Sequence, residues 1–172
     1  MTSILNILEI PTLPRKDYIK LREGLPYELR KILDEAYLLD REIDALRRLV
    51  AALEKVNVVY ITKVIERFSK LAADILVYYR KYLTEDKYAR FKDEVNKFMK
   101  CLMAGLTRLR EPSYNAAVII ISLKLFIYTL VYIPLRKMKE DMNRVIIERF
   151  AKHVESCLGL LPEPSEIIKE AR

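Results

Sequence analysis

Residues 116–135 read AAVIIISLKLFIYTLVYIPL, and this stretch decides how the chain must fold. It contains one charged side chain, Lys124, in a protein of which 32% of the residues are charged. Its β-branched residues would also suit a strand, but no other part of the chain has a strand pattern that could pair with it, so we expect a helix. A helix without a polar face must be surrounded by lipid, by its own fold or by other subunits.

A membrane span is favoured by the length of the stretch, because about 20 apolar residues cross a bilayer, and by the basic residues that follow it. Lys124 argues against a span, since a charge near the bilayer centre costs about 3 kcal/mol even on lenient insertion scales. We therefore expect the interior helix of a bundle, with Lys124 extending outward along its aliphatic stem. Part of this surface is expected to lie between subunits, and a membrane is not an expected partner.

The rest of the chain shows helical periodicity. Apolar residues recur every three or four positions in two successive runs, from Leu29 to Leu53 and from Ile61 to Tyr82, with a slip near Asn57. The first run predicts a helix from about Pro26 to Val56, which follows the chain breaker Gly24. The series of that helix is Leu29, Ile32, Ala36, Leu39, Ile43, Leu46, Val50 and Leu53.

Two more helices are expected. Thr84 precedes two acidic residues, a pattern typical of a helix N-cap, and the helix that it opens ends at residues 111–113. Pro134 is expected to end the apolar helix, and the amphipathic run over residues 135–157 then predicts one long helix that closes at Gly159. The predicted fold class is all-α, a helical bundle of about five helices with an extended N-terminal arm.

The chain has 172 residues, 52% of them hydrophobic, which suits a single domain. We expect an extended basic N-terminal arm over residues 1–25, because Pro11 and Pro14 restrict the backbone there. The helical bundle is expected over residues 26–161, and a short C-terminal tail over residues 162–172. The apolar residues of the arm would contact a neighbouring subunit, and they are Ile4, Leu5, Ile7, Leu8 and Ile10.

The residue types needed for common catalytic chemistry are scarce. His153 is the only histidine, and the two cysteines, Cys101 and Cys157, lack the spacing of a metal site. Three scattered glycines exclude a phosphate-binding loop. The alternating charges over residues 40–48, with Asp40, Glu42 and Asp44 among arginines, are interpreted as a solvated helix face. We therefore expect a non-enzymatic protein without a catalytic residue, a bound metal or a cofactor.

The net charge of +7 is concentrated in the N-terminal arm and the last long helix. Basic side chains beside tyrosines, as in YYRKY at residues 78–82, suit contacts with the phosphates and bases of nucleic acid. The chain lacks glutamine and tryptophan and is rich in charge, a trend of hyperthermophile proteins. Its N-terminus has no secretory signal pattern, so we expect an intracellular, cytoplasmic or virion location.

A basic N-terminal arm followed by a compact helical bundle resembles the α-helical major capsid proteins of filamentous viruses of hyperthermophilic archaea. The resemblance covers the whole chain in its organisation, although this chain is longer and more charged. In that family, paired capsid proteins wrap linear double-stranded DNA into a filament. The resemblance implies a set of DNA-facing residues, namely Arg15, Lys16, Lys20, Arg22, Arg30, Lys31, Arg47 and Arg48.

These observations favour a structural subunit that self-assembles, alone or with other helical subunits, and binds nucleic acid without sequence specificity. A virion coat protein that wraps double-stranded DNA would fit this description. One alternative is a small all-helical adaptor subunit of a replication or CRISPR-type complex. A second alternative is a single-span membrane protein.

Overall fold

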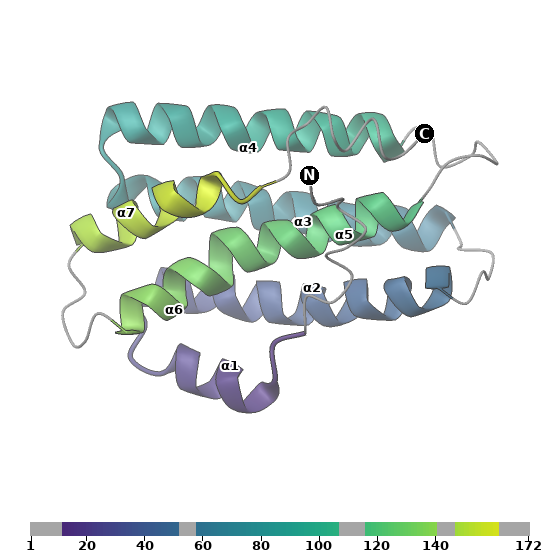
Figure 1. Cartoon of the computed structure of the whole chain (residues 1–172), viewed down its shortest axis with the longest axis horizontal. Coiled ribbons are helices and arrows are strands. Elements are labelled where there is room, and N and C mark those ends of the chain that lie inside the picture. The colour runs from purple at the N-terminus through teal and green to yellow at the C-terminus, as the bar shows by residue number, and fades with distance from the viewer. Residues whose placement is uncertain (1–11, 52–57, 107–115, 141–146, 162–172) are drawn as a thin grey trace.

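The computed structural model describes residues 12–51, 58–106, 116–140 and 147–161. Regular structure in these ranges is helical throughout and contains no strand, so the all-α prediction is confirmed. The elements are α1 (Arg15–Arg22), α2 (Tyr27–Ala51), α3 (Val58–Tyr79), a 3-10 turn (Arg80–Tyr82), α4 (Glu85–Leu106), α5 (Ala116–Ile127), a π-helical segment (Tyr128–Tyr132), α6 (Ile133–Glu140) and α7 (Ile147–Leu158). The longer helices run side by side in an elongated bundle (Figure 1).

The apolar stretch forms the central helix of this bundle. α5, the π-helical segment and α6 are continuous, and α2, α4 and α7 pack around them. The residues from Ile119 to Tyr132 are buried, except for the half-buried Tyr128. Within the described ranges, Ile119–Met138 is the one helix long and apolar enough to cross a membrane, and 83% of its most apolar window lies buried inside the bundle. Other helices of the same chain thus surround it.

The central helix does not end at Pro134, so that prediction was wrong. Proline has no N–H and cannot donate to Leu130, four residues earlier. The Tyr79 hydroxyl donates to the Leu130 carbonyl oxygen instead, at 2.7 Å. Ahead of the proline the chain widens into a π-helical turn, in which the N–H of Ile133 donates to the carbonyl of Tyr128. The prediction of a single helix over residues 135–157 was also wrong, because α6 and α7 are separate helices that pack against each other.

The N-terminal arm is not extended over its whole length, because α1 makes residues 15–22 helical, so that part of the prediction was wrong. Pro14 is extended, but its carbonyl accepts a hydrogen bond from the N–H of Tyr18 at 2.9 Å, and α1 begins directly after it. Proline suits this position because its missing N–H would have no partner in a first turn. Leu21 is buried beneath α1, and the ring of Tyr18 stacks on Tyr37 with ring centroids 4.0 Å apart.

Several local predictions are confirmed. The side chains of the α2 series from Leu29 to Leu46 are buried, and Gly24, at φ +73°, forms the turn before this helix. Thr84 caps α4, where its Oγ1 accepts a hydrogen bond from the N–H of Lys87 at 3.4 Å. α7 ends at Leu158, directly before Gly159. The predicted C-terminal tail and the apolar residues Ile4, Leu5, Ile7, Leu8 and Ile10 lie outside the described residues.

The helices α2 and α3 pack against each other in an antiparallel register. Three side-chain contacts fix the register, and they join Glu28 to Lys81 at 2.8 Å, Lys31 to Tyr78 at 3.4 Å, and Glu42 to Arg67. Residues later in α2 therefore pair with residues earlier in α3. The core-facing sides of both helices, such as Ile43 and Ile75, are fully buried.

Replacing Ile43 with Asp tests whether the buried side of α2 stabilises the fold. Ile43 is fully buried, so the variant places a carboxylate without a partner in the core, and we expect the free energy of unfolding to fall by about 4 kcal/mol. The matched control is Ala45→Asp, on the exposed side of the same helix, which should change it by less than about 0.5 kcal/mol. Urea denaturation followed by circular dichroism measures both values. Equal free energies of unfolding for the two variants would show that Ile43 is not packed in the core.

Candidate functional site

Lys124 is buried in the centre of the bundle, so the prediction that its side chain reaches outward was wrong. The residue is 3% exposed. Its Nζ lies 3.1 Å from Asp40 Oδ1 and 3.5 Å from Asp44 Oδ1, and it donates a further hydrogen bond to Thr12 Oγ1 at 3.1 Å. The central helix therefore directs its charge toward α2 and the segment that precedes α1.

The carboxylate of Asp40 completes this buried network. Asp40 is 2% exposed, and its Oδ2 accepts a hydrogen bond from the Tyr132 hydroxyl at 3.2 Å. The interpretation of Asp40 and Asp44 as part of a solvated face was therefore wrong. Burial and the neighbouring Asp40 raise the pKa of Tyr132, so its hydroxyl keeps its proton and remains a donor.

The sequence contains a signal for this network that periodicity counting overlooks. Asp40 lies four residues after Ala36 and three before Ile43, inside the apolar stripe of α2. A carboxylate at such a position and a lysine at the centre of an apolar helix each need a buried partner of opposite charge. The two could have been paired on that ground. The pair serves to attach α5 to α2.

A second polar contact, between half-buried carboxyl groups, lies between α2 and α3. Burial and the neighbouring carboxyl group of Asp74 raise the pKa of Glu35 to about 7, while Lys31 and Lys70 oppose that rise. The Oδ2 atom of Asp74 is buried and has no hydrogen-bond partner among the described residues. Two adjacent carboxyl groups repel each other when both are ionised, so the protonated form of Glu35 is favoured.

This pair predicts a pH-dependent stability. The folded chain keeps a proton on Glu35 up to about pH 7, whereas an unfolded chain loses it near the ordinary value of 4.5. Because the folded state then binds more protons, stability should fall as the pH rises from about 4.5 to 7. Glu35→Gln, which has no proton to lose and can donate to Asp74, should lessen this fall and be more stable than the parent at pH 8.

Thermal unfolding from pH 4 to pH 8 measures the effect. Glu66→Gln is the matched control, because Glu66 is an exposed glutamate on α3. The control should follow the parent curve. A Glu35→Gln variant with the parent's pH dependence would show that the carboxyl pair does not hold a proton.

The residues expected to face DNA lie on two helices, α1 and α2. Arg15, Lys16 and Lys20 are exposed together on α1. Arg22 is also exposed, but it forms an ion pair with Asp34, with its Nε 3.0 Å from Oδ1. α6, which packs against α1, adds the exposed residues Arg136 and Lys137, which the predicted set did not include.

The remaining members of the predicted set lie on α2. Arg30 is half-buried over the ring of Tyr27, 6.0 Å from its centroid, and Lys31 contacts Tyr78. Arg47 and Arg48 belong to the last turns of α2, and their side chains lie outside the described part of the structure. The structure therefore places the three α1 residues on one exposed helix, while Arg22, Arg30 and Lys31 line one shallow hollow between α1 and α2.

The YYRKY stretch contributes mainly to packing. Tyr79 and Tyr82 are buried, where both rings contact Phe150 edge to face with centroids 5.1 Å apart. Lys81 pairs with Glu28, and Arg80 lies over the ring of Tyr88. Buried rings cannot stack on bases, so Tyr79 and Tyr82 are not available as the aromatic platform that the sequence suggested.

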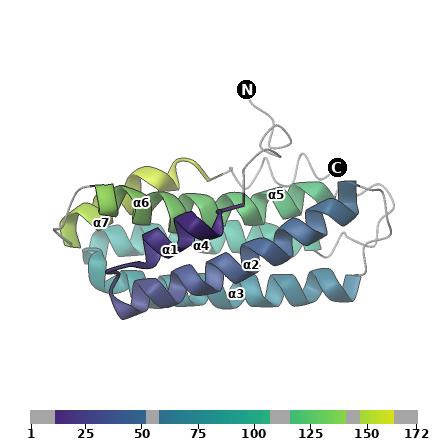
Figure 2. The same cartoon turned by 90° about the horizontal axis from the view of Figure 1, so that it is seen from below.

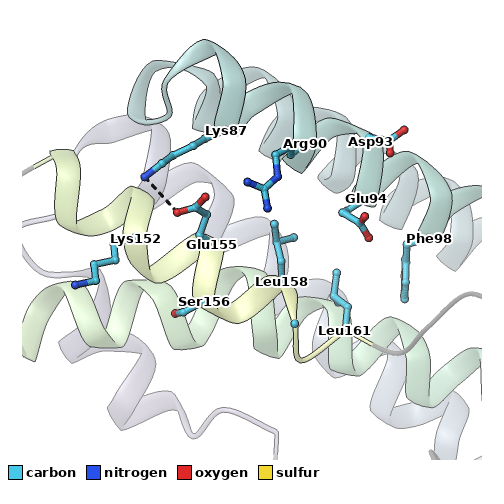
Figure 3. Close-up of a pocket in the computed structure, with 11 residues that line it drawn as sticks. Lys87, Arg90, Asp93, Glu94, Phe98, Lys152, Glu155, Ser156, Leu158 and Leu161 are labelled. Atoms are coloured by element: carbon cyan, nitrogen blue, oxygen red, sulfur yellow. Dashed lines mark ion pairs between the residues drawn. The ribbon is translucent and has the colours of Figure 1, made fainter.

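A cavity of about 600 Å³ lies between α4 and the end of α7 (Figure 3). Arg90 and Glu94 point from α4 toward α7, and Lys87 forms an ion pair with Glu155 at 3.2 Å. The cavity's charged residues are of both signs and are Lys87, Arg90, Lys152, Asp93, Glu94 and Glu155. This mixed lining selects neither an anion nor a cation by charge.

The described side chains offer little to metal or thiol chemistry. No group of three His, Cys, Asp or Glu residues that could hold a metal ion occurs among them. Burial raises the pKa of the Cys157 and Cys101 thiols, so both are weak nucleophiles at neutral pH. His153 is half-buried on α7, near Cys157 in sequence.

Comparison of the chain with protein-family models, with curated proteins and with solved structures gave no match. The resemblance to archaeal filamentous-virus capsid proteins therefore stays a prediction. The basic residues of α1, and the outer faces of the bundle, are the features on which a function can be argued.

Proposed function

We propose that the protein is a non-enzymatic structural subunit that self-assembles and binds nucleic acid, in particular double-stranded DNA, without sequence specificity. The observation that carries the proposal is the exposed basic group on α1, which consists of Arg15, Lys16 and Lys20. Lysine and arginine side chains bind phosphates and release counterions, which gives affinity without reading the bases.

The anchoring of α1 supports this role. Leu21 is buried, and the Tyr18 hydroxyl donates to the Asp34 carboxylate, which also pairs with Arg22. One side of the helix is thus held on α2, while its basic side chains face solvent. A fixed helix presents its charges to a phosphate backbone at a lower entropic cost than a flexible segment would.

The distribution of charge gives further support. Several basic residues elsewhere are paired with carboxylates, as in Lys81 with Glu28 and Lys87 with Glu155. The exposed cations of α1 and of the neighbouring α6 add to an attraction to polyanions. A coat protein that wraps linear double-stranded DNA would use such a surface.

An adaptor subunit of a multiprotein complex is the second candidate. It is favoured by the large apolar side chains that lie exposed on the bundle, since these suit a protein partner better than a phosphate backbone. The two candidates differ in one measurable property, because an adaptor of this kind need not bind duplex DNA.

The salt dependence of DNA binding tests the proposal. The variant Arg15→Ala, Lys16→Ala, Lys20→Ala removes up to three phosphate contacts, so the slope of log affinity against log salt should become less steep by up to about 2.7. Binding by the parent protein should not depend on the DNA sequence. Fluorescence titration of a labelled duplex across a salt series measures both properties.

The matched control removes three exposed lysines from α3 and α4, as Lys63→Ala, Lys92→Ala, Lys100→Ala. It lowers the net charge equally and should leave the slope near that of the parent. A parent protein that fails to bind duplex DNA at low salt would favour the adaptor instead. Equal slopes for the α1 variant and the control would show that α1 is not the binding surface.

A further inference from the structure

The shallow hollow between α1 and α2 has a volume of about 500 Å³. Figure 2 shows α1 beside α2 along one side of the bundle, and the two helices pack against each other. The hollow is lined by Arg22, Tyr27, Arg30, Lys31, Asp34, Glu35 and Leu38. The α2 residues among these recur every three or four positions, so they form one stripe along that helix. Clefts of about 300–1,000 Å³ are of the size that holds a small organic group.

Tyr27 provides an exposed aromatic ring in this hollow. The residue is 67% exposed, and among the tyrosines whose side chains the structure describes it is the only exposed one. The guanidinium group of Arg30 lies over the ring, 6.0 Å from its centroid, and helps to orient it. An exposed ring is a surface on which an unpaired base can stack. Tyr27 therefore offers the aromatic platform that the buried Tyr79 and Tyr82 cannot.

Positive charge is in excess around this ring. Arg22 pairs with Asp34, so these two charges balance. Arg30 and Lys31 then share the lining with one further carboxyl group, Glu35, which keeps its proton up to about pH 7. Below that pH the lining carries three positive charges and one negative charge.

The charged groups of α3 that face Glu35 do not remove this excess. They are Lys70 and Asp74, which are of opposite sign and balance each other. A lining with more cations than anions attracts phosphate groups. It disfavours a second copy of the chain, whose net charge is +7.

We propose that the hollow between α1 and α2 binds an unpaired nucleotide of a nucleic-acid strand, with the base stacked on Tyr27 and the phosphate beside Arg30 and Lys31. The inference rests on the proposed function and adds a second kind of contact to it. The basic side chains of α1 bind phosphates of any nucleic acid, whereas the hollow adds affinity only where a base is free to leave its stack. In a duplex the faces of the bases are covered by their neighbours, so the ring of Tyr27 gains nothing there.

Fluorescence titration of a labelled oligothymidylate at about pH 6, where Glu35 keeps its proton, tests the inference. Tyr27→Leu keeps an apolar side chain but removes the ring, so we expect the affinity to fall at least about 5-fold. Tyr27→Phe keeps the ring and should bind within about twofold of the parent. The matched control is Tyr88→Leu, because the ring of Tyr88 also lies beneath an arginine, Arg80, at 5.5 Å. The control should bind like the parent.

A second variant, Arg30→Ala, Lys31→Ala, tests the phosphate contacts. It should make the slope of log affinity against log salt less steep by up to about 1.4, because each phosphate neutralised on a single strand contributes about 0.7. Its control, Lys92→Ala, Lys100→Ala, removes two exposed lysines from α4 and should keep the parent slope. An unchanged slope in the Arg30→Ala, Lys31→Ala variant would contradict a phosphate in the hollow.

Three further outcomes would overturn the inference, once circular dichroism has verified the fold of each variant. They are a parent that does not bind the oligothymidylate at low salt, equal affinities of Tyr27→Leu and Tyr88→Leu, and an equal loss by Tyr27→Leu on the oligothymidylate and on a duplex of the same length. Failure of the proposed function gives a different result. A parent that binds the oligothymidylate through Tyr27 but does not bind the duplex would contradict the duplex proposal and support the hollow.

Discussion

The ion pair between Lys124 and Asp40 is the constraint on which the arrangement of the bundle depends. Burial of apolar surface has no direction, so a helix as apolar as α5 could pack in many rotations. A buried ammonium group is tolerated only where carboxylates meet it, and the Asp40 and Asp44 side chains of α2 do so at 3.1 and 3.5 Å. The position of this one charge therefore selects both the neighbour of the central helix and its rotation.

A second polar contact connects the same helix to α3. Pro134 leaves the Leu130 carbonyl without its usual donor, and Tyr79 supplies one from the opposite helix. Aromatic packing lies between the two polar levels, with the rings of Phe68 and Phe126 4.8 Å apart. The core is thus held together by contacts at several positions along the bundle. The basic side chains on its exterior, on α1, are the basis of the proposal for nucleic acid.

Local sequence signals were sufficient for much of the fold, because helix caps and three-four spacing act over a few residues. They predicted the start of α2, the Thr84 cap of α4 and the end of α7. They did not predict α1, whose buried Leu21 needs a partner helix, or the continuation through Pro134, which needs the Tyr79 hydroxyl. The buried charges were missed for the same reason, since partners 84 residues apart meet only in the folded chain.

A double-mutant cycle between Lys124 and Asp40 tests this account most directly. The free energy of unfolding would be measured for the parent, Lys124→Met, Asp40→Asn and the double variant. Each single change takes from a buried charge its nearest partner of opposite charge and should lose about 3–5 kcal/mol, whereas the double variant should lose clearly less than the sum, with a coupling energy of about 2 kcal/mol or more. Additive losses within about 0.5 kcal/mol would show that the two charges do not depend on each other, and that apolar packing alone positions the central helix.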